Sequence, residues 1–415
     1  MELMAFELWM LRFFQELQQV ILMLLLLWWE KKLLILYWLN KKYRISEMIR
    51  ITSIETFCNE FVGFVRVTDE TGSQGWGQVS TYHSDITCQV LHRQVAPWVL
   101  GVQISDLDDL LDLVTEREHK FPGSYLRRAI GGFDTAIWDL RGKQSQKPVV
   151  ELLGGTSGKL RAYASSMKRD ITPKEEAERL VRLQGEFGYD AFKVRAGAEV
   201  GRNEDEWPGR TEEIIPTMRK YLGDNASLLI DANSCYSPDR AIEVGHMLED
   251  NGFCHFEEPC PYWELDQTKT VTDTLNIDVT GGEQDCDIPT WKRMIDMRAV
   301  DIVQPDILYL GGIARTMRIV ELAKSAGLPV TPHCANLSLV TLFTMHLLKA
   351  IPNAGKYLEF SIEGADYYPW QQNLFKNSLF DIEDGCVSIK SDPGWGFEIN
   401  DEWLSKSIYQ VSNLE

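Results

Sequence analysis

Three acidic residues end three successive apolar runs at equal intervals along the chain. Asp231 ends LLID, Glu257 lies in CHFEE and Glu283 ends VTGGE, so the two intervals are 26 residues each. An interval of this kind fits one strand and one helix of a repeating βα unit. In a barrel of parallel strands, residues at the carboxyl ends of neighbouring strands converge on one face. The spacing therefore predicts a barrel in which three carboxylates meet.

A divalent cation is the natural partner of such a cluster. Three bare carboxylates at one point would repel each other, and a cation relieves that repulsion. Mg2+ prefers oxygen ligands, so we expect it at Asp231, Glu257 and Glu283. Glu258 would point to the other face of a regular strand, and we expect it to support the ligands rather than to bind the ion.

The same repeat runs through most of the chain. From about residue 161, short β-rich stretches alternate with amphipathic helical stretches such as 173–187, 240–251 and 312–326. The expected strands are 161–166, 190–196, 227–233, 254–259, 278–284, 301–306, 328–333 and 356–360. Their polar ends are Lys193, Arg195, Asp231, Asn233, Glu257, Glu283, Asp306, His333 and Glu359. So many ionisable groups on one face of a packed barrel indicate an active site.

Several motifs identify a family resemblance. They are GWGQ at 75–78, DTAIWDLRGK at 134–143, KPVVELLGG at 147–155, KVR at 193–195, the three acids, QPD at 304–306 and PH at 332–333. From about residue 48 to its end the chain resembles the enolase superfamily and, within it, the mandelate racemase group. The resemblance implies a modified (β/α)7β barrel of the TIM type with an α+β capping domain. It also implies an essential Mg2+ and removal of a proton α to a carboxylate.

The resemblance divides the chain into four segments. We expect a hydrophobic extension at 1–47, a capping domain at 48–160, the barrel at 161–374, and a segment at 375–415 that returns to the capping domain. Family-like sequence begins abruptly at Met48, so we expect the extension to come from a start codon assigned too far upstream. Its apolar runs are shorter than the span of about 20 residues that a membrane helix needs. An interfacial membrane helix or an oligomer contact is the alternative.

The resemblance and one departure from it bear on the catalytic base. In the family the second lysine of a KxK motif removes a proton, and here that position is Arg195. Arginine has a pKa above about 12, so it makes an anion clamp and a poor base. His333 and Asp306 match the family's His-Asp dyad, in which the carboxylate orients the imidazole and raises its basicity. The sequence therefore predicts one strong base.

One base suits elimination better than racemisation. A single histidine can take the α-proton and then return it to the departing hydroxide, as in the acid-sugar dehydratases that the chain resembles. We expect an aldonate or aldarate to become a 2-keto-3-deoxy acid. The alternative is a racemase or epimerase of a 2-hydroxy acid or amino acid derivative, with Lys193 as a second base if Arg195 lowers its pKa. A non-catalytic descendant that binds sugar acids is a third reading.

Other site residues follow from the same match. Glu359 corresponds to the acid that donates a hydrogen bond to the substrate carboxylate, which requires a raised pKa; pairing with a basic neighbour is the other reading. Lys193 adds positive charge where the enediolate forms. Asn233 is expected to bind a substrate hydroxyl or the ligands of the metal. Tyr82 and His83 are candidate sugar contacts from the capping domain.

Composition sets the remaining expectations. The chain has a net charge of −19 and no basic stripe or dinucleotide fingerprint, so we expect a small carboxylate substrate and no nucleic acid. Its eight scattered cysteines suit a reducing compartment, and we expect a cytoplasmic homo-oligomer with no membrane span. The first capping link, 58–60, is short, so we expect a more open site or closure by another segment or subunit.

Overall fold

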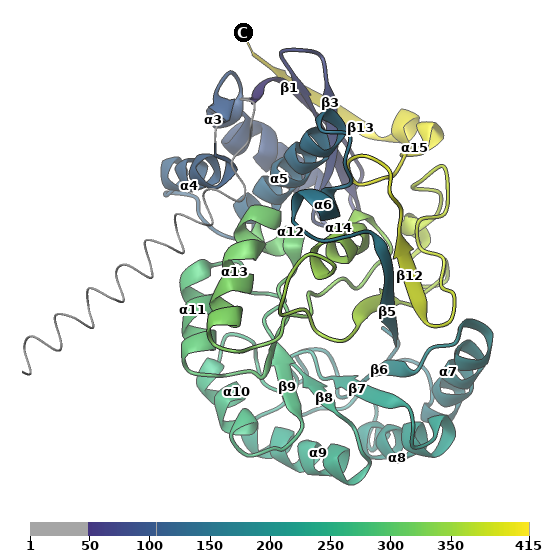
Figure 1. Cartoon of the computed structure of the whole chain (residues 1–415). Helices are drawn as coiled ribbons and strands as arrows, with labels where there is room; N and C mark the ends of the chain where they lie inside the picture. Colours follow the sequence, from purple (N-terminus) through teal and green to yellow (C-terminus); the bar gives the residue numbers. More distant parts are fainter. Residues whose placement is uncertain (1–48, 105, 415) are drawn as a thin grey trace, which may run out of the picture. The chain divides into compact units, whose positions relative to one another are not determined.

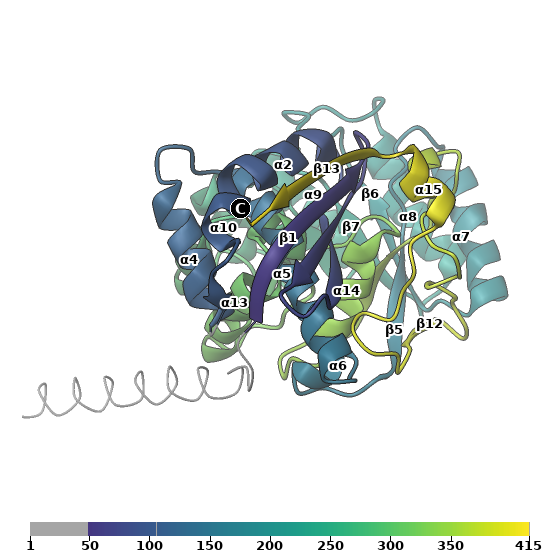
Figure 2. The ribbon, with the colours of Figure 1, turned by 90° about the horizontal axis from the view of Figure 1, so that it is seen from above.

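The computed structural model of the protein describes residues 49–104 and 106–414, so the expected N-terminal extension lies outside the described residues. One of the two sheets is antiparallel, with its strands in the order β13-β1-β2-β3. Its strands are β1 (Ile49–Cys58), β2 (Gly63–Asp69), β3 (Gln74–Val79) and β13 (Ile408–Asn413), and β4 (Gln103–Ile104) also pairs with β1. Figure 2 shows β13, from the end of the chain, running alongside β1.

Helices α2 (Ser84–Val90) and α5 (Ser124–Gln144) pack against this sheet. The same part of the chain also contains η1 (Leu91–Val95), α3 (Ala96–Val99), α4 (Leu107–Arg117) and α6 (Val149–Leu152). The glycines of the GWGQ motif explain how closely β3 approaches α5. A Cβ on Gly77 would collide with backbone atoms of Gly132 and Ala136. These motif glycines are therefore required by packing.

The second sheet is parallel and follows the order β10-β9-β8-β7-β6-β5-β11. Its strands are β5 (Gly158–Ser165), β6 (Ala191–Arg195), β7 (Ser227–Asp231), β8 (His255–Glu257), β9 (Asp278–Gly281), β10 (Ile302–Val303) and β11 (Leu358–Ser361), with β12 (Cys386–Ile389) antiparallel to β5. Figure 1 shows the connecting helices on the outside of these strands. They include α7 (Pro173–Phe187), α8 (Arg210–Leu222), α9 (Pro238–Asp250), α10 (Leu265–Thr272), α11 (Ile288–Asp296) and α13 (Ile313–Ser325). The predicted modified barrel with a capping domain is confirmed.

The seventh expected strand, 328–333, is shorter than predicted. Val330 alone bridges Val303 on one side and Ala354 on the other. Pro329 and Pro332 have no N–H to donate, so a longer ladder cannot form around Val330. The parallel course still continues, because His333 N donates to the carbonyl of Pro305 at 3.2 Å. His333 is therefore delivered to the same end of the sheet as the other strand-end residues.

Local signals explain where the barrel helices begin and end. Helix α7 has the bounds that its sequence pattern predicts, and Thr172 and Glu175 form a capping box at its start. Gly188 ends it in the left-handed conformation, with φ of 74°. The short helices α12 (Ile307–Leu310), η2 (Pro369–Gln371) and α15 (Asp401–Lys406) and the buried α14 (Leu339–Leu348) complete the described elements.

Two motif side chains join the capping sheet and its helices to the barrel. Asp134 on α5 is fully buried and accepts hydrogen bonds from the backbone of Ile313 at 2.6 Å and Ala314 at 3.2 Å, at the start of α13. Gln78 on β3 accepts one from Leu339 N at 3.0 Å, at the start of α14. Both side chains satisfy amides that a helix leaves without partners. The family motifs at 75–78 and 134–143 therefore hold the cap against the barrel.

Within the described ranges, no helix combines the length and the apolar character that crossing a membrane would need.

Candidate active site

The carboxyl ends of the strands bring the predicted acids together. Register places Arg195 beside Asp231 and Asp231 beside Glu257 on β6, β7 and β8. Glu283 follows β9, the next strand of the sheet. Asp231, Glu257 and Glu283 are buried, with exposed fractions of 0%, 1% and 6%. Burial, assisted by the charges of Asp231 and Glu257, raises the pKa of Glu283 to about 7. The three acids therefore form one buried cluster.

Lys193 lies inside this cluster. Its Nζ is 2.8 Å from Oε2 of Glu257, 2.7 Å from Oε1 of Glu359 and 3.9 Å from Oδ2 of Asp231. Burial alone would lower the pKa of Lys193, but the charges of Glu257 and Glu359 raise it above its usual value. This corrects the idea that Arg195 depresses the pKa of Lys193 enough to make it a second base. In this arrangement Lys193 carries a positive charge.

Arg195 acts as a clamp on the same acids. Its Nη1 pairs with Asp231 and donates to Oδ1 of Asn233 at 3.0 Å, while its Nε donates to the carbonyl of Ser166 at 2.9 Å. Burial would lower the pKa of Arg195, but Asp231 and the other carboxylates raise it. The side chain of Asn233 bonds to both partners, because its Oδ1 accepts from Arg195 and its Nδ2 donates to Asp231 at 3.2 Å. Its amide thus orients the charged groups around it.

Two site residues were missed or misplaced by sequence reasoning. Arg169, in the segment after β5, donates from Nη2 to Oδ1 of Asn233 at 2.6 Å. The sequence feature that could have identified Arg169 is its position four residues after the end of β5, the first barrel strand. Glu258 was expected on the opposite strand face, but β8 ends at Glu257 and Glu258 has a φ of 40°. Its buried carboxyl has a pKa well above the usual value, because of burial and the charges of Glu283 and Asp231.

The expected dyad is present across the site. His333 Nδ1 lies 2.9 Å from Oδ2 of Asp306. The other oxygen of Asp306 accepts hydrogen bonds from Leu308 N at 2.7 Å and Tyr309 N at 2.9 Å, which fixes the carboxylate at the start of α12. His333 Nε2 lies 3.4 Å from Oε2 of Glu283. Burial would lower the pKa of His333, but Glu283 and Asp306 raise it to about 10.

Glu359 differs from the expectation of a protonated hydrogen-bond donor. Its carboxylate accepts from Ser165 Oγ at 2.8 Å and from Cys334 N at 2.9 Å, and it pairs with Lys193. Burial would raise the pKa of Glu359, but Lys193 lowers it to about 2. In this arrangement Glu359 is an ionised acceptor, because its partner is a buried ammonium.

Tyr82, one of the two predicted capping contacts, belongs to an aromatic cluster, defined as Phe61, Tyr82, Tyr368 and Trp370. Phe61 stacks on Trp370 with ring centres 6.2 Å apart, and the ring of Tyr82 lies 6.1 Å from each of them. The segment after β11 therefore packs against Phe61, the residue directly after the short first capping link. Tyr82 is 45% exposed. His83 is also exposed, and its ring has no hydrogen bond within the described residues.

Oxygen ligands for a metal are gathered here but are engaged with cations. As the side chains lie, no three His, Cys, Asp or Glu residues within 49–104 and 106–414 are arranged to hold a metal ion. Lys193 and Arg195 contact the oxygens of Asp231 and Glu257 instead. The donor set nevertheless suits Mg2+, because all three acids offer oxygen and Oε1 of Glu257 is buried without a hydrogen-bond partner. An ion could bind once the two basic side chains give up these contacts.

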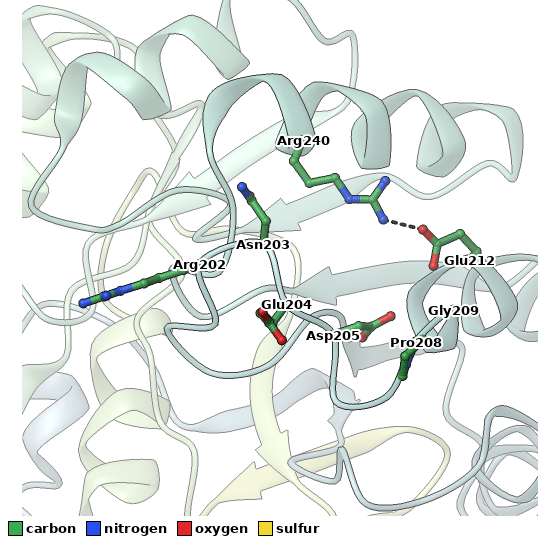
Figure 3. Close-up of a pocket in the computed structure, with 8 residues that line it drawn as sticks. All are labelled: Arg202, Asn203, Glu204, Asp205, Pro208, Gly209, Glu212 and Arg240. Carbon is green, nitrogen blue, oxygen red and sulfur yellow. Dashed lines mark hydrogen bonds and ion pairs between the residues drawn. The ribbon is translucent and has the colours of Figure 1, made fainter.

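Figure 3 shows a surface pocket with its own set of lining residues. Its volume is about 370 Å³, and its lining comes from the loop before α8, the first turn of α8 and the start of α9. An ion pair between Arg240 and Glu212 crosses it, and Asn203 Oδ1 accepts from Ser237 N at 2.7 Å. None of the predicted site residues lines this pocket, so we assign it no role in the chemistry.

The fold and the strand-end cluster together define a barrel enzyme family. Residues 173–403 match the family described as enolase C-terminal domain-like, and residues 42–154 match the N-terminal domain of mandelate racemase and muconate lactonizing enzyme. The chain belongs to the mandelate racemase group of the enolase superfamily.

Three similar proteins illustrate its relations. Arabinonate dehydratase of Saccharolobus solfataricus is 28% identical over 339 residues, covering 80% of this chain and 86% of that protein. The crystal structure of a candidate racemase from Roseobacter denitrificans is 77% identical, with a TM-score of 0.88, and covers 88% of this chain and all of that one. A mandelate racemase/muconate lactonizing protein from Paracoccus denitrificans, complexed with magnesium, is 28% identical, with a TM-score of 0.79, covering 88% and 98% of the two chains.

Proposed function

We propose that this protein is a Mg2+-dependent acid-sugar dehydratase, which converts an aldonate or aldarate to a 2-keto-3-deoxy acid. The observation that carries the proposal is the single His-Asp dyad opposite two basic residues that cannot accept a proton readily. His333 is held by Asp306 at 2.9 Å, whereas Lys193 is paired with two carboxylates and Arg195 is an arginine. The dehydratase activity of similar proteins supports the same assignment.

Asp231, Glu257 and Glu283 would hold the metal ion. When bound, Mg2+ supplies positive charge next to the substrate carboxylate, where negative charge develops as the α-proton leaves. Lys193 and Arg195 contribute further positive charge from β6. Burial would lower the pKa of His333, but Glu283 raises it in this arrangement, and the carboxylate of Glu283 lies 3.4 Å from Nε2. Commitment of Glu283 to a cation would lower that pKa and free Nε2 to accept a proton from the substrate.

His333 then serves in both halves of the reaction. Its Nε2 takes the α-proton, and the resulting imidazolium gives that proton to the departing β-hydroxyl, so that water leaves. Asp306 keeps Nδ1 hydrogen-bonded throughout and therefore keeps the ring oriented. The enol that remains rearranges to the 2-keto-3-deoxy acid. Asn233 keeps Arg195 in place, and Tyr82 and His83 remain candidate contacts for the sugar chain.

A racemase or epimerase is the second candidate function. The description of the similar protein from Roseobacter denitrificans as a candidate racemase favours it. That reaction needs a proton acceptor on each face of the substrate, and Lys193 would have to leave Glu257 and Glu359 to provide one. The pairing of Lys193 therefore supports elimination.

A substrate screen separates the two functions. Purified protein with Mg2+ is incubated with aldonates and aldarates, and the formation of 2-keto acid is measured together with deuterium uptake from D2O. Formation of 2-keto-3-deoxy product that stops with chelator is the expected result. Deuterium uptake into a recovered epimer with no keto product from any sugar acid would establish the second candidate instead.

A further inference from the structure

Arg128 on α5 brings a positive charge from the cap to the dyad side of the site. Its Cζ lies 3.5 Å from the ring centre of Tyr309, and its Nη1 donates to Oγ of Ser80 at 2.9 Å. The ring of Tyr309 is in turn 5.9 Å from that of His333. Arg128 is thus separated from the dyad by a single aromatic ring.

The guanidinium of Arg128 has no carboxylate partner within the described residues and keeps free N–H donors. Its contacts within residues 49–104 and 106–414 are Tyr309 and Ser80, and neither partner is a carboxylate. Two other part-buried arginines are paired with acids: Arg66 with Glu55 at 2.6 Å, and Arg179 with Glu363 at 2.9 Å. A guanidinium offers five N–H donors in a planar fork, and hydrogen bonds to the hydroxyls of Ser80 and Tyr309 leave others free.

A second polar group lies on the same side of the site. Asn336, three residues after His333, is 6% exposed, and its Nδ2 lies 3.4 Å from Oγ1 of Thr81. Its Oδ1 is buried without a hydrogen-bond partner in the described structure. Thr81 follows Ser80, which contacts Arg128. An acceptor without a hydrogen-bond partner and a cation without an acidic partner therefore lie close to the same short cap segment, Ser80 and Thr81.

Sheet order separates this position from the other basic residues. Lys193 and Arg195 lie on β6, and Tyr309 follows β10, with β7, β8 and β9 between them in the sheet. The acids of the cluster come from those three intervening strands. Positive charge therefore flanks the acid cluster on two sides, and a substrate that reaches both sides needs an anionic group at each end.

We propose that Arg128 binds a second carboxylate at the end of the substrate remote from the reacting carbon, so that the substrate is an aldarate rather than an aldonate. This inference rests on the proposed dehydratase function. An arginine fork matches a carboxylate by two parallel hydrogen bonds, whereas the hydroxymethyl end of an aldonate offers no charge to pair. Asn336 Oδ1 would accept a hydrogen bond from a neighbouring sugar hydroxyl.

Binding, measured separately from turnover, tests the proposal. The complete set of six-carbon aldarates is compared by calorimetry, in the presence of Mg2+, with aldonates of the same hydroxyl configuration. Each pair differs only in a terminal carboxylate against a hydroxymethyl group. We expect at least one aldarate to bind about 10- to 100-fold more tightly than its partner, as charged hydrogen bonds of typical strength would give. Arg128→Gln should remove the preference and leave the affinity for the aldonate nearly unchanged.

Two further variants sharpen the result. Arg128→Lys keeps the charge but not the fork, so it should retain only part of the preference. Arg117→Gln, at a cap arginine that lies over the ring of Trp98, is the matched control and should change nothing. An aldonate as the best ligand, a preference that survives Arg128→Gln, or no binding by any aldarate would overturn the inference.

Turnover distinguishes this inference from the proposed function on which it rests. Dehydration of an aldonate, with no preference for diacids, would leave the dehydratase assignment standing and remove the role of Arg128. An Arg128-dependent preference for a diacid that is bound but never dehydrated would leave the carboxylate subsite standing and remove the dehydratase assignment.

Discussion

The ammonium of Lys193 lies 2.7 Å from Oε1 of Glu359, and both side chains are fully buried. The two residues come from β6 and β11, which flank β5 in the sheet. Glu257 on β8 contacts the same ammonium from the other direction at 2.8 Å. A buried cation between two carboxylates is well compensated, and removal of either partner would leave charge without a counterion. The pair therefore makes Glu359 a partner of Lys193 rather than a donor to substrate.

Glu359→Gln distinguishes these two roles. A glutamine amide can donate a hydrogen bond as a protonated acid does, so the variant would stay active if Glu359 were a neutral donor. If Glu359 is the ionised partner of Lys193, the substitution leaves Lys193 short of a counterion, and kcat/KM should fall about 10- to 100-fold, as loss of an orienting partner typically costs. Steady-state kinetics with circular dichroism as a check on folding gives the answer. Near wild-type activity in Glu359→Gln would contradict the pairing.

Removal of charge from the three clustered acids should abolish metal binding and turnover. Asp231→Asn, Glu257→Gln and Glu283→Gln keep the shape of each side chain but weaken an oxygen ligand. Elemental analysis after dialysis against Mg2+, together with the dehydration assay, measures both effects. Asp278→Asn, at the opposite end of β9, is the matched control and should bind metal normally. Bound metal and full activity in all three variants would refute the site.

The sequence could predict the positions of some site residues but not of others, and the difference has physical causes. Asp231, Glu257 and Glu283 could be located because each lies at or just after a strand end, where the βα repeat alone sets the position. Glu258 could not, because its side chain direction depends on a left-handed backbone turn with φ of 40°. The pairing of Lys193 with Glu359 depends on the register of strands distant in the chain.

Contacts from outside the barrel strands were the hardest to predict. Arg128 reaches the dyad side only because α5 packs against α12, and the motifs at 75–78 and 134–143 hold that packing. The aromatic cluster depends likewise on two loops meeting. A sequence pattern describes periodicity along one segment, so it cannot show which side chains of two separate segments will face each other.

His346 should make the fold less stable in mild acid. Its Nδ1 accepts a hydrogen bond from Val150 N at 3.0 Å, and burial lowers the pKa of the imidazole to about 3. The unfolded chain takes up a proton below about pH 6.5 while the folded chain does not, so stability is full above that pH and is lost as pH falls toward 3.

The size of this effect can be measured by urea unfolding at pH 7 and pH 5. Linkage gives a loss of about 2 kcal/mol at pH 5 from His346 alone. His346→Gln, whose amide oxygen can still accept from Val150 N, should lack this part of the pH dependence. His246→Gln, at an exposed position on α9, is the control. Equal pH dependence in wild type and His346→Gln would contradict the assignment.

His333 decides between elimination and epimerisation. In the proposed mechanism His333 is the sole base and also the acid that expels hydroxide. His333→Asn should therefore reduce both α-proton exchange and water loss by about 100-fold or more, the usual share of general acid-base catalysis. Asp306→Asn should reduce both less, because the imidazole loses its orientation at 2.9 Å from the carboxylate. Lys193→Met should weaken substrate binding while some exchange persists.

Deuterium uptake from D2O into each epimer measures these effects. Exchange of one epimer that continues in His333→Asn and disappears in Lys193→Met, without any 2-keto-3-deoxy product, would replace the dehydratase by a two-base epimerase.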